Sequence, residues 1–130
     1  MTKIVVFDVE TNRVDDPDVM WICGGLDIST NEITRFEPFR GEEEKQKCAR
    51  WFQSIDILVG HRAIQFDAIQ INRLVKKNLI DPSKVIDTLI VSRLANYGIS
   101  IPKGAKSPHS LEAWGLRLGE HKGDFSSFDE

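Results

Sequence analysis

Two acidic residues stand two positions apart at the end of an apolar run near the N-terminus. The stretch reads VVFDVET over residues 5–11, and its acids are Asp8 and Glu10. Successive side chains on a strand point to opposite faces, so both carboxylates share one face and lie about 7 Å apart. A third acid, Asp67, stands four residues before Ile71 in a helical pattern and belongs to its inward stripe. We therefore expect three partly buried carboxylates to face one another.

Buried carboxylates gathered in this way need a counter-charge. Without one, burying the charged groups lowers the stability of the fold by about several kcal/mol, or the groups take up protons. Hard divalent cations such as Mg²⁺ take oxygen ligands, and a pair of them can hold the attacking and leaving oxygens of a phosphoryl displacement. Each acid taken singly is also typical of a turn or a helix cap, and we interpret Asp87 as such a cap. Together, the spacing of Asp8 and Glu10 and the position of Asp67 favour a metal site.

The elements that must position these acids follow from the apolar pattern. It predicts a strand, a hairpin, a helix, a strand, a helix, a short strand and two further helices. The first strand is rich in Ile, Val and Phe, so we expect it near the centre of a sheet with both faces covered. A mixed sheet with flanking helices, an α/β fold, is the natural packing for this order. The main ranges are strand 3–9, a hairpin over 19–39, helix 41–55, strand 56–61, a helix from 67, strand and helix over 84–98, and helix 109–119.

The last two helices are each predicted to turn one apolar face inward. We expect Gly98 to end the first of them. For the second we expect Ser107 to act as the N-cap and Gly119 to end the helix. The residues predicted to point inward are Ile90, Leu94, Tyr97, Leu111, Trp114 and Leu118.

Length and composition limit the class of protein. With 130 residues, 41% of them hydrophobic, the chain is expected to form one domain with one core. No apolar stretch reaches the length of a membrane span and no signal peptide is recognisable, so we expect a soluble, cytosolic protein without membrane contact. Cys23 and Cys48 lack metal-binding spacing and are predicted to be buried free thiols. His61 and His109 are interpreted as loop or capping residues.

The charge is distributed unevenly although the net charge is −3. Residues 1–59 carry 7 Lys and Arg against 12 Asp and Glu, whereas residues 60–122 carry 10 against 5. A basic face of this size suits local contact with a phosphate backbone. On charge alone, a solvated mixed surface explains the distribution equally well.

Several motifs resemble those of a known family. FDVET resembles the first motif of the DnaQ-like (DEDD) 3′–5′ exonucleases, and GHRAIQFDAIQINRL resembles the second. VIDTLIVSRL and PHSLEAWGLRLGEHKGDF are similar to the proofreading exonuclease domain of family A DNA polymerases from short-tailed phages. The likeness extends along nearly the whole chain. It implies a ribonuclease H-like fold in which Asp8, Glu10 and Asp67 match three of the four metal-binding acids.

The resemblance also implies a reaction and its participants. Two Mg²⁺ or Mn²⁺ ions would serve the release of nucleoside 5′-monophosphates from the 3′ end of single-stranded DNA. Thr11 and Asn12 would lie near the terminal nucleotide and Phe66 would help to wall the pocket, while Arg62 would reach a phosphate. A polymerase domain on the same or another chain would be the partner. For a phage-encoded chain the location would be the cytoplasm of the bacterial host.

The sequence departs from the family pattern in two places. Arg62 stands where the family commonly has Asn. The third motif, which carries the fourth acid, would lie beyond the end of the chain, so we expect an exonuclease-like domain over 1–130 that ends before it. Nothing in the setting of Asp124, Asp129 and Glu130 marks them as substitutes. Activity of the isolated chain is therefore expected to be low or absent.

Two alternatives remain open from the sequence. One is an exonuclease of the same fold that acts mainly on RNA, because the sequence does not reveal sensitivity to the 2′-hydroxyl group. The other is a non-catalytic module that uses the basic residues 60–122 to bind DNA ends or a replication partner.

Overall fold

The computed structural model describes residues 1–120, which form two compact units. The first unit is Met1–Thr88 and the second begins at Leu89. The expectation of a single domain over 1–130 stays a prediction, and the acids at positions 124, 129 and 130 lie outside the described residues.

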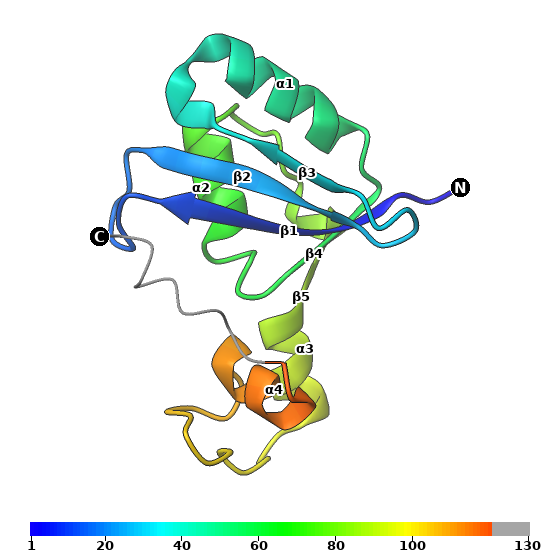
Figure 1. Cartoon of the computed structure of the whole chain (residues 1–130), viewed down its shortest axis with the longest axis vertical. Helices are drawn as coiled ribbons and strands as arrows, with labels where there is room; N and C mark the ends of the chain where they lie inside the picture. The colour runs from blue at the N-terminus through cyan, green and yellow to red at the C-terminus, as the bar shows by residue number, and fades with distance from the viewer. Residues whose placement is uncertain (121–130) are drawn as a thin grey trace. The chain divides into compact units, whose positions relative to one another are not determined.

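The first unit is built on a mixed five-stranded sheet with flanking helices, as the sequence predicted. The strand order is β3-β2-β1-β4-β5, and Figure 1 shows β1 between β2 and β4. β1 pairs with β2, and β2 with β3, in antiparallel fashion, whereas β1 with β4 and β4 with β5 are parallel. This α/β arrangement is compatible with a ribonuclease H-like fold. The strands are β1 (Ile4–Thr11), β2 (Met20–Asp27), β3 (Ile33–Phe36), β4 (Ile57–Gly60) and β5 (Val85–Asp87).

Side chains of β1 alternate between a buried and an exposed face. Val5, Phe7 and Val9 are buried in the core, where they meet residues of α1 (Glu42–Gln53) and α2 (Asp67–Leu74). On the other face Val6 is 43% exposed, and the side chains of Asp8 and Glu10 are exposed as well. The prediction that β1 is covered on both faces is therefore wrong in this structure. An antiparallel neighbour lets a sheet present one solvated face, and both helices of the first unit pack on the Val5 side.

The predicted thiols are both free and fully buried, which confirms that expectation. Cys23 comes from β2 and Cys48 from α1. A hydrogen bond with the Cys48 thiol and burial together raise the pKa of the Cys23 thiol well above its usual value of 9.0. Both groups therefore act as small apolar core residues that join the sheet to α1.

The hairpin and the helix that follows it are confirmed. β2 and β3 pair around a turn in which the Asp27 carboxylate accepts hydrogen bonds from the amide and hydroxyl of Ser29. Asn31, which has a positive φ of 62°, takes the left-handed position that Asn tolerates. The next helix, α1, has three acids in its first turn, where they complement the helix dipole.

The second unit contains α4 (Leu111–Leu118) and all of α3 (Thr88–Ala95) after its first residue. The Ser92 hydroxyl lies 2.7 Å from Nδ1 of His109 and accepts a hydrogen bond of 2.7 Å from Nε1 of Trp114. Gly119 ends α4 in the left-handed conformation, as predicted. In residues 1–120, none of the helices is both long and apolar enough to cross a membrane.

Two sequence predictions for the second unit are wrong. The N-cap of α4 is Ser110, whose hydroxyl accepts from the amide of Ala113, and not Ser107. The predicted inward faces also differ, because Leu89, Ser92 and Ala113 are the buried residues of α3 and α4. Of the six residues predicted to point inward, five are exposed, namely Ile90, Leu94, Tyr97, Leu111 and Leu118.

Candidate active site

The candidate site lies where the three parallel strands of the first unit end. β1, β4 and β5 run in the same direction, so their carboxyl ends meet at one edge of the sheet. The ladder between β1 and β4 stops at the pair Val6 and Val59, although β1 continues to Thr11. Beyond that pair the edge of β1 is open to the loop of residues 61–66 and to the start of α2.

Asp8 and Asp67, two of the three acids that the sequence predicts to face one another, come together at this edge. Asp8 projects from β1 and Asp67 is the first residue of α2, 6% exposed. The two carboxyl groups are hydrogen-bonded to each other, and the backbone N–H of Val9 also donates to Asp67. Two acids from segments almost sixty residues apart in the sequence therefore form one pair.

The electrostatics of the pair favour a cation. Burial, the charge of Asp8 and the hydrogen bond between the two carboxyl groups together raise the pKa of Asp67 from its usual 3.8 to about 8. Such a pair must either share a proton or bind a positive ion. Hard divalent cations prefer carboxylate oxygens, so the pair fits Mg²⁺ or Mn²⁺.

Glu10 is not gathered with the other two acids. Within residues 1–120, no group of three or more His, Cys, Asp or Glu side chains is close enough to hold a metal ion. Glu10 shares the exposed face of β1 with Asp8, two positions further along the strand. The strand spacing that suggested the site also explains this separation, because such neighbours are about 7 Å apart.

A cleft of about 480 Å³ opens beside the pair. It brings together most of the side chains that the sequence predicted for the site, although Asp8 is not among its lining residues. The predicted residues that line it are Glu10, Thr11, Asn12, Arg62, Phe66 and Asp67.

Thr11 and Asn12 also have structural tasks at the cleft. The Thr11 hydroxyl donates to the carbonyl of Arg13 at 2.9 Å. The Asn12 carbonyl oxygen accepts from the amides of Asp18 and Val19, and its Nδ2 donates to the Asp18 carboxylate at 2.6 Å. Both side chains therefore brace the loop between β1 and β2, and a contact with substrate stays a prediction.

Two further lining residues, Arg13 and His61, were not predicted as part of the site. Nδ1 of His61 lies 2.9 Å from the Thr88 hydroxyl, which agrees with a loop role for this histidine. Arg13 forms an exposed ion pair of 3.2 Å with Asp18. The signal in the sequence is positional, because His61 directly follows β4 and Arg13 stands two residues after the end of β1, at the same edge of the sheet.

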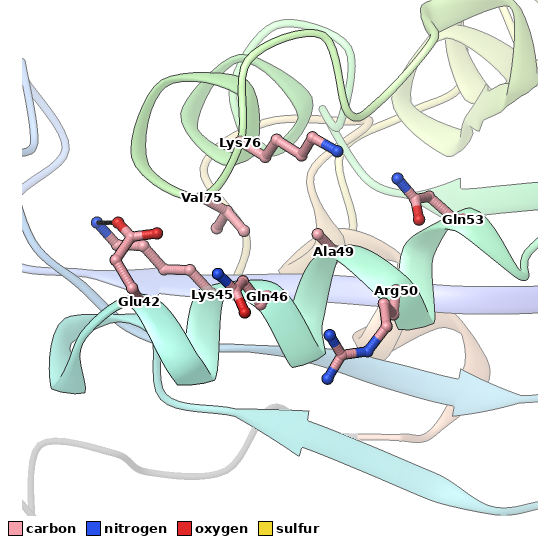
Figure 2. A pocket seen from close by; sticks show the side chains of 8 residues that line it. All are labelled: Glu42, Lys45, Gln46, Ala49, Arg50, Gln53, Val75 and Lys76. Carbon is pink, nitrogen blue, oxygen red and sulfur yellow. Dashed lines mark ion pairs between the residues drawn. The ribbon is translucent and has the colours of Figure 1, made fainter.

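A second hollow of about 380 Å³ has a different character (Figure 2). It lies along α1 and the residues that follow α2. Its charged lining residues are the cations Lys45, Arg50 and Lys76 and a single acid, Glu42, whose carboxylate lies 3.9 Å from Lys45. Without a carboxylate pair, this hollow does not offer the metal chemistry of the cleft.

Comparison with known proteins connects the chain to phage replication enzymes. No model of a protein family matches it. The DNA-directed DNA polymerase of Escherichia phage T7 is 27% identical over 139 residues, and that of Enterobacteria phage T3 is 26% identical over 139 residues. Each match covers 94% of this chain but only 20% of the polymerase. The chain is thus distantly similar to a part of a nucleic-acid enzyme and spans about a fifth of its length.

Proposed function

We propose that the chain is a 3′–5′ exonuclease domain of the proofreading type, which removes nucleoside 5′-monophosphates from the 3′ end of single-stranded DNA. The observation that carries the proposal is the contact of Asp8 with Asp67 at the edge of the cleft. The distant similarity to phage DNA polymerases supports a DNA substrate and a polymerase domain as partner.

In this proposal the acids bind metal, and the other residues of the cleft bind the DNA strand. Asp8 and Asp67 would hold Mg²⁺ or Mn²⁺, and Glu10 lies on the same strand face to add a further carboxylate. A metal held there would polarise a phosphoryl oxygen and would lower the pKa of a water molecule. Arg62 contributes a fixed positive charge for a phosphate of the strand. Phe66 offers an apolar wall for the terminal nucleotide.

The arrangement of the acids predicts weak catalysis by the chain alone. Two carboxylates are in contact and a third is separate, so one ion is expected to bind more tightly than a second. A phosphodiester displacement that uses two ions would then be slow. Nuclease activity of the 130-residue chain is accordingly expected to be low or absent, even where metal binds.

A non-catalytic DNA-end module is the second candidate. It is favoured by the lack, within residues 1–120, of a three-acid group able to hold a metal ion. Such a module would bind single-stranded DNA without divalent metal and would tolerate Asp8→Ala.

The test is a calorimetric Mn²⁺ titration of the chain and of Asp8→Ala. Glu32→Ala, which removes an exposed acid at the hairpin, serves as the matched control. We expect binding that Asp8→Ala loses and Glu32→Ala keeps. Incubation with 3′-labelled DNA and RNA oligonucleotides of the same sequence then follows release of the terminal nucleotide. If no Mn²⁺ binds and DNA binding survives Asp8→Ala, the exonuclease proposal is wrong and the module stands.

A further inference from the structure

The loop of residues 61–66 joins β4 to α2 and carries three lining residues of the cleft, His61, Arg62 and Phe66. Its backbone is irregular, and Arg62 has a left-handed φ of 60°. This conformation is unfavourable for a residue with a Cβ atom, so the surrounding structure has to hold it in place.

Asp87 supplies two of the contacts that hold this loop. Its carboxylate accepts a hydrogen bond of 2.9 Å from the amide of Arg62 and one of 3.1 Å from the amide of Ile64. Asp87 is the last residue of β5, is 4% exposed, and lies opposite Gly60 in the parallel ladder. A buried carboxylate with one backbone donor on each oxygen is a strong and directional anchor.

Thr88 adds a side-chain contact next to this anchor. Its hydroxyl lies 2.9 Å from Nδ1 of His61. The last residue of β5 and the first residue of α3 therefore contact three residues of the loop, namely His61, Arg62 and Ile64.

Gly60 shows that the loop also packs closely on the sheet. A Cβ atom at this position would lie 2.8 Å from Cβ of Ala63 and 3.1 Å from the ring of Phe7. The loop thus turns back against its own strand, and the side chain of Arg62 is carried to the cleft that Asp67 and Glu10 also line.

We propose that Asp87 and Thr88 are positioning residues, which fix the left-handed backbone of Arg62 so that its guanidinium faces the phosphate backbone of a strand in the cleft. The inference rests on the proposed function for the identity of the strand. The other part of the inference, that the loop conformation depends on Asp87, is supported by the hydrogen bonds to the amides of Arg62 and Ile64 and does not need the proposed function.

The first test measures the loop without any substrate. Asp87→Asn keeps the shape of the side chain, but its NH₂ group faces one of the two amides, so at least one hydrogen bond is lost. We expect amide hydrogen exchange at Arg62 and Ile64 to become about tenfold faster, in line with the loss of a bond to a charged group. Amides in β1 and β2 should keep their protection. Asp81→Asn is the control, because Asp81 accepts from Ser83 in a separate exposed turn.

The second test measures binding of a single-stranded DNA oligonucleotide in EDTA. Asp87→Asn and Arg62→Ala should each weaken binding by about tenfold, as expected for one charge-assisted contact. The double variant should be no weaker than Arg62→Ala alone, because a positioning residue acts through the residue that it positions. Additive losses would overturn the proposal, since Asp87 would then act independently of Arg62.

Variants of Thr88 keep the proposal testable should Asp87→Asn fail to fold. Thr88→Val removes the hydroxyl at nearly constant volume, whereas Thr88→Ser retains it. We expect weaker DNA binding for Thr88→Val and recovery for Thr88→Ser. Equal affinities for the two variants, or unchanged amide protection in Asp87→Asn, would overturn the role of this pair. If the unmodified chain binds no DNA, the proposed function is wrong. The amide exchange rates then decide by themselves whether Asp87 holds the backbone of the loop.

Discussion

At the scale of single residues, Asp67 is a carboxyl group that the fold buries against another carboxyl group. Burial, the charge of Asp8 and the hydrogen bond between the two groups raise its pKa from the usual 3.8 to about 8. Between these values the folded protein holds a proton that the unfolded chain releases, so the free energy of unfolding falls as the pH rises. We expect this loss of stability in metal-free buffer from pH 4 to about 8, and none from Asp67 at higher pH.

Urea unfolding of the chain and of Asp67→Asn over this pH range checks the prediction. Histidines titrate in the same window, so the informative quantity is the difference in unfolding free energy between the two proteins. This difference should favour the variant increasingly up to about pH 8 and then level off. Asp8→Asn should lower the pH at which this difference levels off, because the charge of Asp8 also raises the pKa of Asp67. A difference that does not change with pH would contradict the assignment.

The sequence could predict those features of the site that follow from local strand and helix periodicity, but not those that depend on the tertiary structure. Asp8 and Asp67 are predictable as candidates because strand and helix periods show which side chains share a face, although the face of β1 that carries Asp8 is exposed. The loop contact of Asp87 could not be found in this way, because it depends on the register of β5 against β4 and on the path of the loop. The separation of Glu10 from the pair likewise requires distances between side chains.

At the scale of elements, the N-terminus of α4 provides a direct comparison of two serines. Ser110 caps the helix through the amide of Ala113 at 3.0 Å. Replacing such a cap by Ala costs about 0.5–2 kcal/mol of helix stability. Ser110→Ala should therefore speed amide exchange in α4, whereas Ser107→Ala should leave it unchanged. Equal effects of the two substitutions would show that the hydroxyl of Ser110 is not the cap.

The two serines also show why boundaries are harder to predict than elements. The sequence favours Ser107 as the cap because Pro108 follows it, and proline is frequent in the first turn of helices. The structure begins α4 three residues later, where Ser110 precedes Leu111 and Glu112. The existence of the helix and its end at Gly119 were predictable, because a glycine after an apolar period is a strong stop signal. The buried face was not, since it depends on which neighbours pack against the helix.

At the scale of the whole molecule, two hollows compete as the binding surface for nucleic acid. The cleft combines acids with Arg62, while the hollow along α1 is lined by Lys45, Arg50 and Lys76. An exonuclease must bring the 3′ end to the acids, so its DNA affinity should depend on Arg62. A module that only holds DNA through positive charge would be expected to use the hollow with more cations.

The salt dependence of binding decides between these surfaces. For single strands, each phosphate contact contributes about −0.7 to the slope of log K against log salt concentration. We expect Arg62→Ala to make the slope shallower by about this amount and to weaken binding, and Arg50→Ala to change neither. Fluorescence anisotropy of a labelled oligonucleotide at several KCl concentrations, in EDTA to prevent cleavage, provides both quantities. The reverse result, with a shallower slope only for Arg50→Ala, would place the DNA on the helices and argue against the exonuclease, because the strand would then be held at a surface without a carboxylate pair.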